Sequence, residues 1–473
     1  MAETADLPDP VRTEAFLDAV TEFLGVITTH EHRKRTRAIP TLATALTEHL
    51  GVDARQLSVL SETVSTFRAV DADVAVEVVV SRAGGGRLVG IGGGEHRHHA
   101  SLSELIESSA MIGHHPIGAV DYESSSVGPD TERRVVAFGL HLFHHSGVPV
   151  ALLERAPRAS AGMDGRLEVV STDDEVTAAV LAEIRATMLS HSVLRGQVIS
   201  FSVSPYTASS GGVTFLRRTS IPAEDVVLPD GALERVERQV LGVAKHRERL
   251  LAAGQHLKRG VLLYGPPGTG KSHTVQHLLG AAPEVTAIVL AGHALSLVRL
   301  ATETAHAMQP AIVVLEDCDL IAEDRSFHDG PQPLLFEVLD AMDGLGRDAD
   351  VAFVLTTNRA DLLERALAQR PGRVDLAVEI PLPDAQARRR LFRLYAADLP
   401  FSARALKDAA DRTAGVTASF VKEVIRRAVL LAAEAAREVD DAALEEAVAE
   451  LDGDTQRITR SLLGTDAGTS PLR

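Results

Sequence analysis

The sequence predicts an α/β protein built on a parallel sheet with a phosphate-binding loop, preceded by an α+β N-terminal domain. Three observations support this fold class. A glycine-rich loop joins an apolar strand at 261–264 to a helix-like stretch at 273–279. Past Arg259, strands and helices alternate, which is typical of a parallel sheet covered on both faces. From Asp384 onward the chain is almost entirely helical.

Composition and charge narrow the class of protein. At 473 residues the chain is long enough for two or three domains with ordinary cores. The net charge of −17 argues against a nucleic-acid partner, and the one cysteine, Cys318, excludes a disulfide within the chain. No stretch approaches the ~18–20 apolar residues that span a bilayer, and the acidic N-terminus lacks the order of a secretory signal. We therefore expect a cytoplasmic protein without a membrane span.

Residues 1–192 are predicted to form the α+β domain, with a role in client binding or regulation. Apolar residues at helical spacing occur on both sides of Pro40, and a helix at 101–111 has Ser101 as its cap and Glu104 in the capping-box position. The β-branched run at 74–80 predicts a strand. Further elements are expected as strands at 88–91, 134–140, 149–153 and 167–170, a helix at about 174–189, and hairpin turns at glycines 84–86 and 92–94.

Histidines in this domain are clustered and raise the question of a metal site. The clusters are His96, His98 and His99, then His114 and His115, then His141, His144 and His145. Imidazole is a common metal ligand. However, no cluster has the His-Glu-x-x-His spacing of a helical zinc site, and no cysteine pairs accompany them. We expect surface or loop histidines, with metal binding as the alternative.

Residues 193–223 are predicted to bridge the two parts of the chain. Apolar stretches at 198–203 and 213–216 flank the turn Ser209-Ser210-Gly211-Gly212, which is a β-hairpin pattern. A helix-like stretch at 233–251 then leads to Gly254 and the strand before the glycine-rich loop.

The glycine-rich loop has the pattern and context of a Walker A phosphate loop. Glycines let the backbone amides wrap phosphates, and the following helix directs the positive end of its dipole at the same anion. We expect Lys271 to reach the β- and γ-phosphates and the Ser272 hydroxyl to bind Mg²⁺. The predicted nucleotide-binding residues of this loop are Gly265, Pro266, Pro267, Gly268, Thr269, Gly270, Lys271, Ser272 and His273. The sequence therefore predicts binding of a nucleoside triphosphate.

A pair of acids, Glu316 and Asp317, ends the apolar strand expected at 311–315. A carboxylate in this position can hold Mg²⁺ through water, while its neighbour orients the attacking water. We expect Ser272 and Glu316 at the metal and Asp317 at the water.

Several motifs follow one another in the order seen in one known family. They are the phosphate loop, the acidic stretch from Glu316 to Arg325, Met342-Asp343-Gly344, Thr356-Thr357-Asn358-Arg359 and Arg370-Pro371-Gly372-Arg373. Together they resemble an AAA-type ATPase module over residues 224–452. The resemblance implies an α/β core at 224–383 and a helical lid at 384–452, and we expect residues 453–473 to be a disordered tail.

The resemblance also assigns roles to particular residues. It implies that Asn358 senses the γ-phosphate and the lytic water, and that Asp343-Gly344-Leu345 signals between subunits. Arg370 and Arg373 match arginine fingers, which reach the ATP of a neighbouring subunit. Gly415 and Ala418 are expected beside the adenine.

An arginine supplied by a neighbour makes hydrolysis conditional on assembly, because guanidinium stabilises the charge spread over the transferring phosphoryl group. The resemblance therefore implies ATP and Mg²⁺ as cofactors. It also implies a homo-oligomeric ring, with a hexamer as the favoured size.

Three departures from the family pattern qualify this prediction. The usual Asp-Glu order is reversed at Glu316-Asp317, as in the mitochondrial AAA chaperone that translocates the Rieske iron–sulfur protein, so a ring of seven stays open. That group's membrane anchor has no counterpart in this sequence. The stretch His293-Ala294-Leu295-Ser296-Leu297 lacks an aromatic pore loop, and the lid segment around Gly415 lacks the family's Asp. Phe420 in that segment is expected in the lid core.

The leading functional hypothesis is an oligomeric ATPase that remodels or translocates a protein client. The alternatives are a nucleic-acid motor or loader on the same core, and a scaffold that binds ATP with little turnover. A membrane-type AAA protease is excluded as a hypothesis because its zinc motif, His-Glu-x-x-His, is absent from the sequence.

Overall fold

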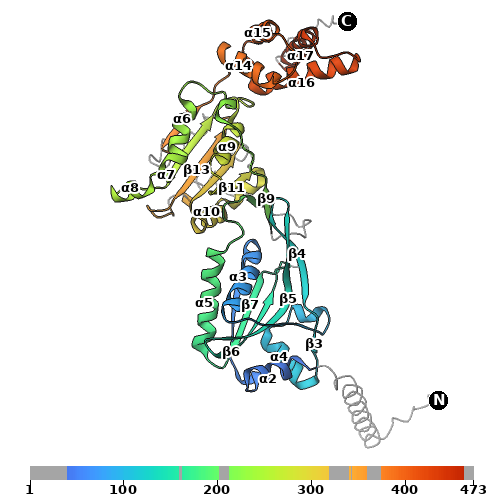
Figure 1. The fold of residues 1–473 in the computed structure, drawn as a ribbon, viewed down its shortest axis with the longest axis vertical. Helices are drawn as coiled ribbons and strands as arrows, with labels where there is room; N and C mark the ends of the chain where they lie inside the picture. The colour runs from blue at the N-terminus through green and yellow to red at the C-terminus, as the bar shows by residue number, and fades with distance from the viewer. Residues whose placement is uncertain are drawn as a thin grey trace, which may run out of the picture. The chain divides into compact units, whose positions relative to one another are not determined.

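The computed structural model describes residues 40–158, 162–201, 212–318, 340–341, 344–359 and 374–462. The chain divides into two compact units, the first comprising residues 1–193 and 204–212 and the second residues 194–203 and 213–473 (Figure 1).

The first unit is a seven-stranded antiparallel sheet with helices on both faces. Its strands follow the order β1-β7-β6-β5-β2-β3, and β4 pairs with β5. The strands are β1 (Val59–Val64), β2 (Gly86–Ile91), β3 (Ile117–Gly118), β4 (Asp121–Gly128), β5 (Thr131–His145), β6 (Val148–Arg155) and β7 (Gly165–Ser171).

Side chains along the central strands point alternately to the two faces of the sheet, which produces two separate cores in this unit. On β5 and β6, Leu140 and Leu153 pack with α2 (Leu42–Leu50) and α4 (Leu102–Ile112). Phe143 and Leu152 face the opposite way and pack with α3 (Ala69–Arg82) and α5 (Asp174–Ser190). Successive strand residues point to opposite faces, so a strand covered on both sides is apolar at nearly every position.

Most element predictions for residues 40–192 are confirmed, whereas one strand and two glycine turns are wrong. The helix predicted before Pro40 lies outside the described residues. The strands at 88–91, 134–140, 149–153 and 167–170 are present, and α4 has the predicted capping box between Ser101 and Glu104. The strand predicted at 74–80 is wrong, because these residues belong to α3. Ala72, Ala75, Val76 and Val79 recur at helical spacing and are all buried, so packing on the sheet overrides the β-propensity of valine. Neither glycine cluster is a hairpin turn: the glycines at 84–86 join α3 to β2, and those at 92–94 join β2 to a 3₁₀ helix (Glu95–His98).

The second unit contains a parallel sheet extended by the predicted hairpin. The strand order is β14-β10-β13-β12-β11-β8-β9. All neighbours are parallel except β9, which is antiparallel to β8. The strands are β8 (Val198–Phe201), β9 (Val213–Leu216), β10 (Arg259–Tyr264), β11 (Thr286–Ala291), β12 (Ala311–Glu316), β13 (Val351–Thr357) and β14 (Leu376–Glu379). The predicted α/β fold class is thereby confirmed, and the hairpin forms the edge of this sheet.

Helices complete the second unit. The helix expected at 233–251 is broken into α6 (Ala232–Glu237), a π-helical segment (Arg238–Gly242), α7 (Val243–Lys245) and α8 (Arg247–Ala252). Four helices, α14 (Ala385–Ala396), α15 (Ala403–Arg412), α16 (Ala418–Glu434) and α17 (Asp441–Leu462), share a core of their own. The helix α17 continues to Leu462, so residues 453–462 are helical and not part of a tail.

A buried carboxyl group lies on β6 in the first unit. Glu154 is 4% exposed, and its carboxylate is 2.9 Å from Nε2 of His141 on β5. Burial raises the pKa of Glu154 above its ordinary value, and the hydrogen bond from His141 opposes this only in part. The carboxylate form is therefore less favourable in the folded unit than in the unfolded chain.

This predicts a pH-dependent effect of Glu154→Gln. Because the folded-state pKa is raised, wild-type stability is lost as pH rises above the ordinary Glu value of about 4.3, at about 1.4 kcal/mol per unit of pKa difference. The neutral amide has no such cost, so the variant should gain stability relative to wild type as the pH rises above about 4.3. Hydrogen exchange of the β5 and β6 amides measures this difference in stability, with the exposed Glu48→Gln as control. A difference between Glu154→Gln and wild type that stays constant with pH would contradict the prediction.

Candidate nucleotide-binding site

The loop between β10 and α9 (Lys271–Gly280) has a backbone that only glycine accommodates. Gly265, Gly268 and Gly270 have φ angles of 145°, 75° and 114°. A Cβ on Gly265 would lie 2.1 Å from the carbonyl oxygen of Ile380, the residue after β14. Side chains rarely adopt these angles, and at Gly265 no side chain fits. The loop is therefore held close to the sheet, as a phosphate loop requires.

Lys271 supplies the positive charge of the loop. The residue is 6% exposed, and its Nζ donates to the carbonyl oxygens of Gly265 at 2.8 Å and Pro266 at 2.9 Å. It begins α9, whose first amides have no acceptor in a preceding turn. An ammonium group and helix-terminal amides together form a donor set that fits a phosphate group. Ser272, the next residue, is exposed.

The acid pair and the sensor residue meet at the same edge of the sheet. Glu316 ends β12 and is half-buried. Asp317 has φ 50°, and its amide donates to the Thr356 hydroxyl on β13 at 3.0 Å. The side-chain amide of Asn358 donates to Oδ1 of Asp317 at 3.5 Å. The amide of Gly265 in turn donates to Thr357 at 3.3 Å, so the phosphate loop is anchored to this same strand end.

The lid contacts the phosphate loop through the start of α16. The amide of Ser419 donates to the carbonyl oxygen of Gly268 at 3.0 Å, and the Thr417 side chain caps the helix. A Cβ on Gly268 would lie 3.0 Å from Oγ of Ser419 and 3.2 Å from Oγ1 of Thr417. Sequence reasoning missed Thr417 and Ser419. The one available signal was the helix-capping pattern at Thr417, which does not reveal a contact with Gly268.

Other predicted residues lie in the lid or outside the described residues. Gly415 has φ 80°, Ala418 is 8% exposed at the start of α16, and Phe420 packs against the lid core as predicted. Arg370, Arg373, Asp343 and the acidic stretch after Cys318 lie outside the described residues, so their assigned roles stay predictions. The thiol of Cys318 contacts the Leu315 carbonyl oxygen at 3.4 Å.

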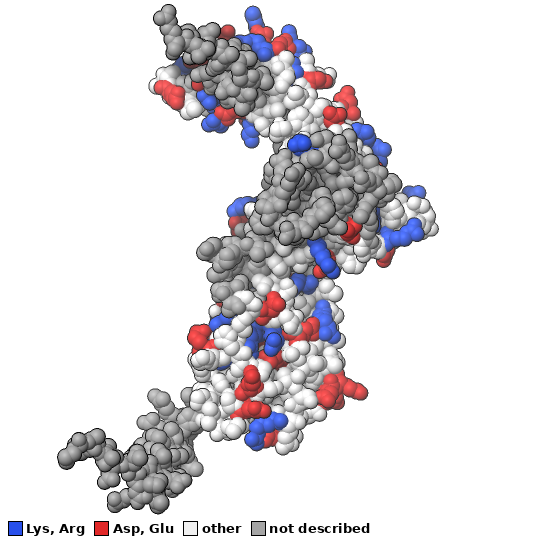
Figure 2. Space-filling view, turned by 180° about the vertical axis from the view of Figure 1, so that it is seen from behind, with Lys and Arg blue, Asp and Glu red and all other residues white. Residues whose placement is uncertain are grey.

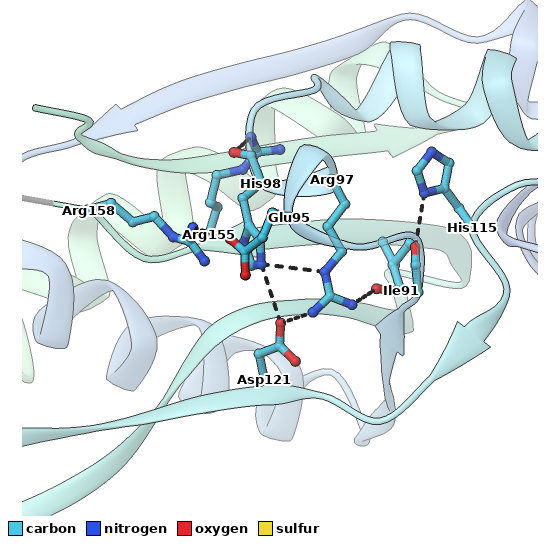
Figure 3. Close-up of polar contacts among 9 residues, drawn as sticks. Ile91, Glu95, Arg97, His98, His115, Asp121, Arg155 and Arg158 are labelled. Atoms are coloured by element: carbon cyan, nitrogen blue, oxygen red, sulfur yellow. Dashed lines mark hydrogen bonds and ion pairs between the residues drawn. The ribbon is translucent and has the colours of Figure 1, made fainter. Parts of the chain in front are cut away.

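Two histidines of the first unit, His98 and His115, have structural partners (Figure 3). His98 is 5% exposed, stacks 4.7 Å from the Phe138 ring and lies 3.6 Å from the Asp121 carboxylate. Burial, helped by Arg158 and Arg97, lowers its pKa. Nδ1 of His115 is 2.9 Å from the Gly92 carbonyl oxygen.

Three of the clustered histidines, His98, His115 and His141, are buried. The prediction of surface or loop positions is wrong for His98, in a 3₁₀ helix, and for His141, on β5. His115 lies in the loop between α4 and β3, as predicted. Across the described parts of the chain, no group of three or more histidine, cysteine or acidic residues could hold a metal ion. The structure therefore offers no support for the metal alternative there.

Comparison with known proteins defines the class of the second unit. Residues 261–382 match the ATPase family associated with various cellular activities (AAA). The chain therefore carries an AAA ATPase domain, whose nucleotide is ATP and whose metal is Mg²⁺. The donor set at Lys271 and the carboxylates at the end of β12 fit both.

Relatives of the chain include bacterial FtsH proteins. The chain is 34% identical over 248 residues to the ATP-dependent zinc metalloprotease FtsH of Mycobacterium tuberculosis, which is 49% of this chain and 32% of that protein. FtsH 2 of Sphaerobacter thermophilus is 34% identical over 268 residues, 51% of this chain and 40% of that protein. FtsH 3 of the same organism is 32% identical over 275 residues, 55% of each chain.

These similarities support an AAA ATPase in general rather than the Rieske-protein chaperone group. The chain spans between a third and just over half of the length of these relatives. Within the residues that the structure describes, none of the helices is long and apolar enough to cross a membrane.

The lid contact predicts a specific effect of Gly268→Ala. Gly254 has a similar φ of 71° but open space around its Cα, so Gly254→Ala is a matched control. Both variants carry the cost of a left-handed alanine, about 1–2 kcal/mol. Only the methyl group at 268 displaces the start of α16, so Gly268→Ala should bind ATP about tenfold more weakly than the control. Titration with a fluorescent ATP analogue measures this, and equal affinities would contradict the contact.

Proposed function

We propose that this protein is a ring-forming ATPase that couples ATP hydrolysis to remodelling or translocation of a protein client. One observation carries the proposal. The phosphate loop, the acid Asp317 and the sensor Asn358 converge at one edge of the sheet, joined by hydrogen bonds from Gly265 to Thr357 and from Asn358 to Asp317. This is the arrangement that hydrolysis needs, because phosphoryl transfer depends on positioning and charge stabilisation.

Each residue of this site has a defined task. Lys271 and the first amides of α9 bind the phosphates, and the oxygens of Ser272 and Glu316 would hold Mg²⁺. The metal ion neutralises charge that develops on the phosphate oxygens. Asp317 orients the attacking water and accepts its proton, while Asn358 holds the Asp317 carboxylate in place. Gly415 and Ala418 would line the site of the adenine.

The ring follows from the residues that complete the site. In this proposal Arg370 and Arg373 reach the nucleotide of the adjoining subunit, which requires a head-to-tail interface, and such an interface forms a ring when its rotation closes. We favour six subunits. The Glu316-Asp317 order is shared with the Rieske-protein chaperone, so a ring of seven subunits is the alternative.

The client is proposed to be a protein, bound by the first unit. The FtsH relatives are named as ATP-dependent proteases, so their ATPase domains serve a reaction on proteins. This sequence has no His-Glu-x-x-His motif, so we do not extend proteolysis to it. The segment Gly292–Leu297 forms a 3₁₀ helix without aromatic residues, which favours remodelling over gripping by aromatic side chains.

Surface charge does not favour the nucleic-acid alternative. On the face that Figure 2 shows, basic and acidic side chains of the described residues are interspersed. Nucleic-acid motors combine a continuous basic groove with aromatic stacking side chains, and the net charge here is −17.

Asp317→Asn tests hydrolysis directly. The amide keeps the size of the side chain but cannot accept a proton, so turnover should fall by about 10²–10⁴-fold. ATP affinity should stay close to wild type, because the phosphate contacts come from Lys271 and α9. Phosphate release and equilibrium ATP binding measure the two effects, with the exposed Asp348→Asn as control. If wild type and Asp317→Asn hydrolyse ATP equally slowly, the scaffold alternative replaces the motor.

A further inference from the structure

The end of α9 opposite the phosphate loop is held by one guanidinium group. Arg218, two residues after β9, donates to the carbonyl oxygens of Leu279 at 2.5 Å and Ala282 at 3.0 Å. Its other terminal nitrogen donates to Val285 at 2.7 Å and Gly196 at 3.0 Å. Carbonyl groups at a helix C-terminus carry partial negative charge and lack partners within the helix, so a cation stabilises them.

The residues after Arg218 are fitted against the same helix. A Cβ on Gly280 would lie 2.7 Å from the Thr219 carbonyl oxygen, so the backbone there touches the last turn of α9. The Ile221 carbonyl oxygen is 2.7 Å from Nδ1 of His277, whose Nε2 is 2.8 Å from Glu237. His277 is 5% exposed. The segment 218–221 therefore fixes the C-terminal half of α9 in position.

The first arm of the hairpin contacts a second helix in the same way. Arg195 donates to the carbonyl oxygens of Ala307 at 3.2 Å and Gln309 at 3.3 Å, at the end of α10 (Val298–Ala307). The hydroxyl of Thr286 accepts from the Gly196 amide at 3.1 Å and donates to Met308 at 3.1 Å. This helix leads into β12, which ends at Glu316.

We propose that the hairpin arms position the catalytic site, with Arg218 as the principal positioning residue. Its bonds to Leu279 and Ala282 join the hairpin to the end of α9, a rigid helix about 15 Å long whose other end carries Lys271. Arg195 does the same for the helix before Glu316. This inference rests on the proposed ATPase function.

Arg218→Ala in the full-length chain tests the proposal. Arg299→Ala is the matched control, because Arg299 lies on α10 in an exposed ion pair with Glu303 at 3.3 Å. Loss of alignment at Lys271 should lower kcat about tenfold or more. ATP affinity should change by less than about threefold, because several phosphate contacts remain. If Arg218 had only a structural role, its loss would lower the fraction of active protein and the thermal stability. The folded protein would then not combine a lower kcat with nearly unchanged ATP affinity.

Hydrogen exchange without nucleotide separates this inference from the proposed function. Residues 276–285 should exchange faster in Arg218→Ala than in wild type or Arg299→Ala. This measurement decides the inference even if wild-type protein does not hydrolyse ATP, an outcome that would overturn only the proposed function. If Arg218→Ala fails to fold, Arg218→Lys, which keeps the charge without the planar fork, is compared in its place. Exchange and kcat equal to those of Arg299→Ala would overturn the inference.

Discussion

The close contact of the phosphate loop with the backbone around it is the constraint on which the site depends. Gly265 lies against the carbonyl oxygen of Ile380 with no room for a side chain, and its amide bonds to Thr357. On the other side, Gly268 accepts from the amide of Ser419 in the lid. Because these partners come from β14, β13 and α16, the loop is held at a point where three distant segments meet. A shift in any of them changes the distance between Lys271 and the acid pair.

Charged groups on both ends of α9 give this helix a central role in the second unit. Lys271 at its start is buried and bonded to the loop carbonyl oxygens, and Arg218 binds the carbonyl oxygens at its end. Only Arg218 complements the helix itself, because the carbonyl groups at a helix C-terminus carry negative partial charge. The first unit uses a different principle, since its sheet is covered on both faces and its polar side chains, such as His98 and Glu154, are buried with partners. Its two cores are complete without contributions from the second unit.

Local patterns were readable from the sequence, whereas contacts between distant segments were not. The strand, glycine loop and helix around Lys271 are contiguous, and so are the capping box at Ser101 and the two arms of the hairpin. The run at 74–80 was misassigned because valine favours strands, yet burial of one helical face decided the conformation. The contacts of Ser419 with Gly268 and of Arg218 with Leu279 join residues far apart in the chain. Arginine and serine are ordinary surface residues in a single sequence, so no local signal marked them.

The most direct test of a shared catalytic site is to mix two inactive variants. Lys271→Ala keeps its arginines but loses its own phosphate site, whereas Arg370→Ala keeps the phosphate site but loses an arginine needed by its neighbour. Each alone should hydrolyse no ATP above background. Mixed in equal amounts before assembly, they should recover about a quarter of wild-type turnover, since one interface in four then joins an intact site to an intact arginine. Full activity of Arg370→Ala alone, or no recovery in co-assembled mixtures, would contradict hydrolysis between subunits.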